Sequence, residues 1–334
     1  MKHNISLLFL VLTLVSCEKI FFEADRATND PFINFEYLWT EVDEKYSYHE
    51  YKGVDWDAIG EKYKSMLYPT MSEDSLFAVL ATMLKELRDD HVNLVSPFNI
   101  SSYEVFLTGP DNYNARTIRD NYIKDFRVTG AFNHAFIKNE KIGYIKYDSF
   151  SEDVDKESLN YILSFYKDTE GLIIDLRTNG GGNPANIAKI LERFSNEKTL
   201  VGYNITRNGP GHNDFGPREP FYIGVYDGVR YHKPIMVLID RSCYSACTFF
   251  AFACKSFPSI TLVGDTTGGG GGLPNGGQLP NSWTYRFSVS QLIDVDGNNY
   301  AEGGVAPDIQ VNFDWSDLSR DEILDKAIDT ILKD

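Results

Sequence analysis

The residue best placed for nucleophilic chemistry is Ser245. The apolar run PIMVLID at 234–240 predicts a buried strand, and an apolar helix is predicted over 245–257. A serine at such a strand-to-helix junction is exposed at the sheet edge, beside the free N–H groups of the helix N-terminus. These groups can hold an oxyanion, as a serine nucleophile requires. The alternative is that Ser245 or Ser242 is only the N-cap of the helix.

A glycine-rich turn, DLRTNGGG at 175–182, follows another predicted buried strand, GLIIDL at 171–176. Backbone N–H groups of such a turn can approach a ligand closely because no side chains intervene. A plain tight turn or a phosphate cradle would have the same composition. The phosphate interpretation is weak, because the Lys-Ser/Thr ending of a nucleotide-binding loop is missing.

His91 and Glu302 could supply acid–base chemistry. His91 lies in LRDDHVNL at 87–94, at the end of a predicted helical region, and a histidine beside carboxylates can act as a general base. Taken alone, a histidine at a helix end is equally consistent with a cap or a surface residue. Glu302, in YAEGGVAPDI at 300–309, would by itself be a solvated loop carboxylate.

The elements that must position these residues fall into two parts. The 334 residues suggest about two domains, and apolar residues at helical spacing predict helices over residues 30–90. Strands alternate with helices from residue 141 onward, which predicts an α/β core. We therefore expect a helical subdomain over 18–94, a connecting segment over 95–140 and the core over 141–334.

The N-terminus has the pattern of an export signal. Ile5–Val15 is an apolar run of signal-peptide length, and it leads into Leu14-Val15-Ser16-Cys17. This resembles a bacterial lipobox, in which Cys17 becomes the lipid-modified first residue of the mature chain. We therefore expect an exported lipoprotein anchored at the outer membrane, facing the periplasm or the exterior. An ordinary secretory signal with a chance cysteine is the alternative.

Charge and cysteine content exclude several classes of function. Lys and Arg number 32 and Asp and Glu 48, so the net charge of 32 − 48 = −16 disfavours nucleic-acid binding. No apolar run is long enough for a membrane-spanning helix. Cys243, Cys247 and Cys254 have no ligand at metal spacing nearby, so we expect small buried hydrophobes and at least one free thiol.

Taken in order, these segments resemble the carboxy-terminal processing (tail-specific) protease family of serine peptidases. The match covers most of the chain after about residue 33. It implies a core of the ClpP/crotonase type, with Ser245 as the nucleophile. It also implies an oxyanion hole formed by the N–H groups of Ala246 and of a glycine in the 180–182 turn, Gly181 above all.

The sequence departs from that family at the general base. The processing proteases use a Lys in a GxxTxGK-like segment, whereas Gly264–Gly270 has glycine at that position. The chain is more similar to the tricorn-core and retinoid-binding-protein-like branch, where a histidine of a DxH-type segment is the base. The resemblance implies that His91 is this base and that Glu302 is the carboxylate of the tetrad. A fourth member, a Ser or Thr hydroxyl, cannot be assigned.

The second departure concerns substrate recognition. Only 46 residues, 95–140, separate Leu94 from Lys141, too few for the PDZ domain of the processing proteases. The resemblance implies an endopeptidase or carboxy-terminal processing peptidase that acts on a peptide or protein and requires no metal or organic cofactor. The alternatives are a non-peptide esterase with the same residues, or a catalytically weak or inactive peptide- or lipid-binding lipoprotein of the same fold.

Overall fold

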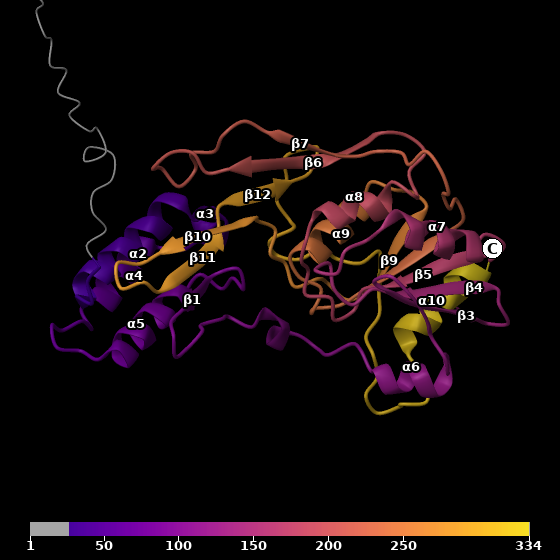
Figure 1. Ribbon diagram of the computed structural model, residues 1–334, viewed down its shortest axis with the longest axis horizontal. Coiled ribbons are helices and arrows are strands. Elements are labelled where there is room, and N and C mark those ends of the chain that lie inside the picture. Colours follow the sequence, from indigo (N-terminus) through magenta and orange to yellow (C-terminus); the bar gives the residue numbers. More distant parts are fainter. Residues whose placement is uncertain (1–26, 334) are drawn as a thin grey trace, which may run out of the picture.

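The computed structural model describes residues 27–333 (Figure 1). The predicted signal segment and Cys17 lie outside the described residues. Within 27–333, no helix combines the length and the apolar character that crossing a bilayer requires.

The N-terminal part is helical, as the apolar spacing predicts. Three of its helices begin at side-chain caps, because Asp30, Asp55 and Ser72 accept hydrogen bonds from backbone N–H groups of the first turn. A short helix lies between the first two long ones, and a 3-10 helix follows further along. The helices are α2 (Pro31–Lys45), α3 (His49–Lys52), α4 (Trp56–Lys64), α5 (Glu73–Lys85) and η1 (Val105–Thr108).

These helices pack on a small antiparallel sheet whose strands come from both halves of the chain. Its order is β1-β11-β10. The strands are β1 (Asn93–Val95), β10 (Pro274–Gln278) and β11 (Thr284–Ser288). Trp283 and Phe287 of the second half are buried in one apolar cluster with Trp56 and Leu80 of the helices. The N-terminal layer is therefore completed by residues 274–288, which we expected inside the core.

The core is a seven-stranded sheet of order β13-β9-β8-β5-β4-β3-β2. The pairs from β13 to β4 are parallel, and β3 and β2 are antiparallel additions at one edge. Its strands are β2 (Arg127–Thr129), β3 (Phe132–Ile137), β4 (Ile142–Lys146), β5 (Gly171–Asp175), β8 (Ile235–Ile239), β9 (Ile260–Gly264) and β13 (Ile309–Gln310). The α/β architecture is confirmed, but the sheet begins at residue 127 rather than 141.

Helices cover both faces of this sheet, so the central strands are buried and read as continuous apolar runs. One apolar cluster joins the sheet to α7 (Lys156–Phe165), α8 (Ala185–Leu191) and α9 (Ala246–Cys254). A second cluster joins the opposite face to α6 (Ala115–Asn121) and α10 (Glu322–Leu332). Cys243, Cys247 and Cys254 are free thiols buried in the first cluster, as expected.

A third sheet, of order β12-β6-β7, extends from the core toward the N-terminal helices (Figure 1). Its strands are β6 (Thr199–Thr206), β7 (Glu219–Ile223) and β12 (Ser290–Ile293). The segment 283–295 is thus divided between two sheets. This division places Ser288, the last residue of β11, at the junction between the helical part and the core.

Candidate active site

Ser245 lies where the sequence predicts, between strand β8 and helix α9. Its backbone has φ 54° and ψ −119°, a left-handed conformation that is rare for a residue with a side chain. Its N–H donates to the carbonyl oxygen of Gly269 at 3.0 Å, which holds this bend in place. The bend places the Ser245 hydroxyl at the carboxyl edge of the sheet rather than along the helix.

The structure brings His91 to this hydroxyl from the other half of the molecule. His91 Nε2 and Ser245 Oγ are 2.9 Å apart, although the two residues are separated by 154 positions in the chain. The backbone N–H of His91 donates to Asp89 Oδ1 at 2.8 Å, which fixes the turn after α5. The imidazole is only 4% exposed. The pair is therefore formed by one residue of the core and one of the helical part.

The other side of the imidazole faces Ser288 and Asp89. His91 Nδ1 is 3.3 Å from Ser288 Oγ, and Ser288 Oγ donates to Asp89 Oδ2 at 3.1 Å. An ionised carboxylate can only accept, so the Ser288 hydroxyl must accept in turn from Nδ1–H. This assigns the proton to Nδ1 and leaves the lone pair of Nε2 directed at Ser245. Ser288 therefore provides the hydroxyl that contacts His91 Nδ1.

Asp89 is held as an anion by several donors. Besides His91 and Ser288, the hydroxyls of Tyr244 and Tyr46 donate to it at 2.9 and 3.1 Å. Burial opposes ionisation, but Lys52, His91 and these hydrogen bonds lower the pKa of Asp89 to about 2. Sequence reasoning missed this residue. The available signal was its position two residues before His91, which is the first letter of the DxH pattern.

Glu302, expected as the carboxylate of the tetrad, lies in the charged cluster next to the site and is not in direct contact with His91. Among residues 27–333, its carboxylate contacts Lys52 Nζ at 2.5 Å and accepts from the Gly271 N–H at 2.9 Å, and it makes no hydrogen bond to His91. Lys52 also lies 3.7 Å from Asp89 Oδ2. Glu302 therefore belongs to the same charged cluster as Asp89, but it meets that cluster through the lysine. The position behind His91 is already taken by Ser288 and Asp89.

Burial determines the protonation of His91 and Glu302. Desolvation lowers the pKa of His91 to about 4, although the charge of Asp89 opposes this shift. The ring is therefore neutral near pH 7 and able to accept a proton. Desolvation and then the charge of Asp89 raise the pKa of Glu302 to about 7, against the opposing effect of Lys52.

The two predicted oxyanion donors differ in availability. Ala246 is the first residue of α9, so its N–H has no acceptor within the helix. A Cβ on Gly181, whose φ is 96°, would lie 2.9 Å from Ala246 N and 2.5 Å from the Tyr244 carbonyl oxygen. Only glycine fits there, so the turn does pack against the nucleophile. In this structure the Gly181 N–H donates to Asn179 Oδ1 at 2.9 Å, whereas no helical acceptor competes for the Ala246 N–H.

A cleft of about 560 Å³ opens in front of Ser245. It lies between the glycine turn, the start of α9 and the N-terminal layer. Arg286 contributes a positive charge to the wall of the cleft, and its guanidinium donates to Asn93 Oδ1 at 2.7 Å. The lining residues are Asp90, His91, Ser149, Ser151, Gly180, Gly181, Gly182, Pro184, Tyr244, Ser245, Ala246, Phe249, Leu273, Pro274 and Arg286. Both halves of the molecule therefore contribute walls to the space beside the nucleophile.

Two models of known protein families match parts of the chain. Residues 141–311, just over half of the chain, match the model of peptidase family S41. The chain belongs to this family. Residues 29–85 match the C1 domain of tricorn protease, which covers helices α2 to α5. The resemblance inferred from the sequence is thus confirmed at the level of the family.

Individual relatives span different shares of the chain. The crystal structure of a candidate peptidase from Parabacteroides merdae superposes with a TM-score of 0.87 at 36% identity, covering 91% of this chain and 98% of that one. Carboxy-terminal processing protease CtpA of Bacillus subtilis is 28% identical over 179 residues, 52% of this chain and 36% of that protein. Tricorn protease of Thermoplasma volcanium is 25% identical over 225 residues, 64% of this chain and 20% of that protein. The chain spans about a third or less of the length of these two curated relatives.

Proposed function

We propose that this S41 family member is a serine peptidase, an endopeptidase or carboxy-terminal processing enzyme that works through an acyl-enzyme on Ser245. The observation that carries the proposal is the 2.9 Å contact between Ser245 Oγ and His91 Nε2. A nucleophile and its base must lie within this distance for direct proton transfer. The peptidase names of the relatives support the reaction class.

The first half of the reaction uses both nitrogens of His91. Ser245 Oγ attacks the peptide carbonyl carbon as its proton passes to Nε2, and the imidazolium then donates this proton to the leaving amine. Water then attacks the acyl-enzyme with His91 again as the base. The buried anion of Asp89, acting through Ser288, stabilises the imidazolium and holds its tautomer. Because these partners position His91 without touching the substrate, we regard Asp89 and Ser288 as positioning residues.

The developing oxyanion would be stabilised at the N-terminus of α9. The Ala246 N–H is the donor with no competing acceptor in the helix, and the helix dipole adds to its effect. For Gly181 to be the second donor, its N–H must leave Asn179 Oδ1 when substrate binds. Removing one such donor lowers kcat by roughly 10²–10³-fold in serine peptidases.

The cleft supports a peptide substrate held between the two parts of the molecule. Its volume of about 560 Å³ suits several side chains of an extended chain. The 46 residues 95–140 hold η1, α6, β2 and β3, and the last two of these belong to the central sheet. We therefore propose that substrate is recognised in the cleft itself, without a PDZ insert.

Labelling with a fluorescent fluorophosphonate tests the nucleophile. The wild type should be labelled and Ser245→Ala should not, whereas the matched control Ser242→Ala should keep full labelling. Ser242 is three residues away and is the alternative nucleophile of the same loop. Labelling that survives in Ser245→Ala and disappears in Ser242→Ala would overturn the assignment.

Digestion of a peptide library then identifies the reaction. Cleavage by the wild type and its loss in Ser245→Ala would support the peptidase. Labelling without peptide cleavage, but with hydrolysis of simple esters, would indicate an esterase. Neither activity, together with retention of a peptide or lipid by the purified protein, would indicate a binding protein of the same fold.

We also propose that the chain is exported and lipid-anchored through Cys17, on the basis of its N-terminal sequence. The test is metabolic labelling with a radioactive fatty acid in a bacterial host. The wild type should incorporate label into the membrane fraction, and Cys17→Ser should not. Export of an unlabelled wild-type protein would indicate an ordinary secretory signal instead.

A further inference from the structure

Three potential metal ligands meet outside the catalytic cleft. Asp43 lies near the end of α2, His49 begins α3, and His212 belongs to the loop of residues 207–218 between β6 and β7. One ligand atom of each lies within 4.8 Å of the other two. None of them contributes to the Ser245–His91 pair, and no feature of the sequence connects them. The cluster therefore requires its own explanation.

Among the residues that the structure describes, the buried Nδ1 of His49 has no hydrogen-bond partner. Its Nε2 contacts the Val42 carbonyl oxygen at 3.1 Å, and because a carbonyl can only accept, Nε2 must carry the proton. Nδ1 then carries the lone pair. Within residues 27–333 this atom is buried without a hydrogen-bond partner, in a side chain only 1% exposed. Leaving such an acceptor unsatisfied costs about 1–3 kcal/mol, so a ligand for it is favoured.

Asp43 and His212 lie against this imidazole. His212 Nε2 contacts Asp43 Oδ1 at 2.8 Å, and each of these side chains is 28% exposed. The two imidazole rings are stacked, with centroids 4.2 Å apart and planes at 22°. An acid and two imidazoles, one of them buried with a free lone pair, form a set of oxygen and nitrogen ligands that suits a divalent transition metal.

We propose that Asp43, His49 and His212 form a binding site for a divalent transition-metal ion of the Zn²⁺ type. Three protein ligands with a water molecule would complete a tetrahedron. Ligands 2.0–2.1 Å from the metal lie about 3.3 Å from one another, so a pair of ligand atoms at the 4.8 Å limit must approach by about 1.5 Å. His212 can provide this movement, because it follows Gly209 and Gly211 in a loop outside the strands.

The cation beside the cluster is bound by backbone carbonyl groups rather than by the carboxylate of Asp43. Arg207 is the nearby cation, and its guanidinium donates to the backbone carbonyls of Tyr46 and Glu44 at 2.9 and 2.8 Å. Its position is therefore set by the backbone, while Asp43 remains available for the metal.

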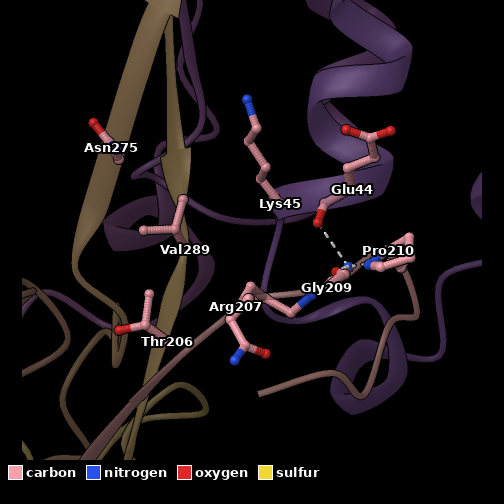
Figure 2. A pocket seen from close by; sticks show the side chains of 9 residues that line it. Glu44, Lys45, Thr206, Arg207, Gly209, Pro210, Asn275 and Val289 are labelled. Atoms are coloured by element: carbon pink, nitrogen blue, oxygen red, sulfur yellow. Dashed lines mark hydrogen bonds between the residues drawn. The ribbon is translucent and has the colours of Figure 1, made fainter. Parts of the chain in front are cut away.

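The site would join two segments that already lie side by side. In Figure 2 the Gly209 and Pro210 backbone lies beside the C-terminal end of α2, and a dashed line marks the bond from Arg207 to the Glu44 carbonyl. A cavity of about 490 Å³ separates this loop from Asn275 of β10 and from Val289, the residue between β11 and β12. His49 shares the single turn of α3 with Lys52, the cation between Asp89 and Glu302. A bound ion would thus fix the helix that carries Lys52.

The direct test is zinc binding by the full-length protein, purified without a histidine tag and treated with EDTA. Isothermal titration with Zn²⁺ and elemental analysis should give one ion per chain for the wild type. His212→Ala should weaken binding by more than the roughly 10–100-fold that loss of an outer-sphere partner causes. The matched control is His232→Ala, an exposed histidine outside the cluster, which should bind zinc as the wild type does.

Two further measurements make the outcome decisive. Co²⁺ should give the visible d–d absorption of a tetrahedral site in the wild type and in His232→Ala, but not in His212→Ala or Asp43→Asn. Zinc should raise the Tm of the wild type and of His232→Ala, but not that of His212→Ala or Asp43→Asn. Equal zinc binding by His212→Ala and the wild type, or no binding by either, would overturn the proposal. His212 is partly exposed in a loop, so its loss leaves the fold available for this comparison.

Discussion

Asp89 and Glu302 are two buried carboxylates that share one cation, yet their surroundings give them opposite properties. Lys52 Nζ lies 3.7 Å from Asp89 and 2.5 Å from Glu302. Asp89 nevertheless has the lower pKa, about 2 against about 7 for Glu302. The shorter distance to Lys52 therefore does not decide which of the two acids remains ionised.

The hydrogen-bond donors around each acid account for the difference. Asp89 accepts from the His91 N–H and from the hydroxyls of Tyr244, Tyr46 and Ser288, whereas Glu302 accepts from the Gly271 N–H and from Lys52. Each donor stabilises the charged form, and the ionised Asp89 in turn disfavours a second charge on Glu302. A permanent anion is thus held on the side that faces His91.

The largest expected effect on activity comes from neutralising each of the two acids in turn. Asp89→Asn removes the anion that fixes the tautomer of His91, so kcat/KM for a peptide should fall by about 10³–10⁴-fold. Glu302→Gln leaves the Ser288–Asp89 contacts intact, and its loss should be about 10-fold or less. Steady-state kinetics of the two purified variants measures this contrast. A larger loss in Glu302→Gln than in Asp89→Asn would support the tetrad role that the resemblance implies for Glu302.

Lys52, the cation shared by the two acids, should affect the stability of the fold more than the recognition of a substrate. In Lys52→Met both buried carboxylates lose their counter-charge, and breaking a buried pair from one side costs about 3–5 kcal/mol of the free energy of unfolding. Urea unfolding followed by circular dichroism measures this loss. Adding Glu302→Gln to Lys52→Met should recover part of it, because one unpaired charge disappears.

A surface ion pair provides the control for Lys52→Met. Lys62 pairs with Glu86 at 2.8 Å, with side chains 54% and 36% exposed. Solvent screens such pairs, so Lys62→Met should leave the urea midpoint almost unchanged. A Lys52→Met midpoint equal to that of Lys62→Met would mean that the buried carboxylates accept protons freely and need no cation.

The sequence predicts the core half of the site well. The apolar strands at 171–176 and 234–240 are neighbours in a parallel sheet, and their carboxyl ends meet at one edge. This adjacency brings the glycine turn to Ser245, as the family resemblance implies. The contact between Ser245 and His91 also agrees with the family resemblance.

The orienting half of the site could not be predicted in the same way. Ser288 ends a strand that leaves the core and pairs with Asn93–Val95, so its approach to His91 depends on a long-range register. A serine in a strand carries no local sign of this pairing. Glu302 was assigned by position in the resemblance, but no sequence pattern shows that Lys52 intervenes. His49 and His212 escaped notice for the same reason.

The two acids should also give opposite dependences of stability on pH. The pKa of Glu302 is raised from 4.5 to about 7, so its contribution is present below pH 4.5 and is lost as the pH rises through 7. The pKa of Asp89 is lowered from 3.8 to about 2, so its contribution is present above pH 3.8 and is lost as the pH falls through 2.

Urea unfolding between pH 5 and pH 8 isolates the Glu302 contribution. His91 and Asp89 titrate equally in the wild type and in Glu302→Gln, so their effects cancel in the difference between the two proteins. The wild type should lose stability relative to Glu302→Gln over this range. A constant difference would mean that Glu302 is already ionised at pH 5 and that Lys52 dominates its surroundings.

The smallest effect is expected for the hydroxyl that links His91 to Asp89. Ser288→Ala removes the bridge of 3.3 and 3.1 Å but leaves the anion in place, so kcat should fall by about 10-fold with KM unchanged. Ser288→Thr keeps a hydroxyl at the same position and should restore most of the rate, which a merely structural role in β11 would not require. Equal rates in Ser288→Ala and the wild type would show that Asp89 acts on His91 through the field of its charge alone. In that case the charge of Asp89 alone, without the Ser288 hydroxyl, would distinguish the role of Asp89 from that of Glu302.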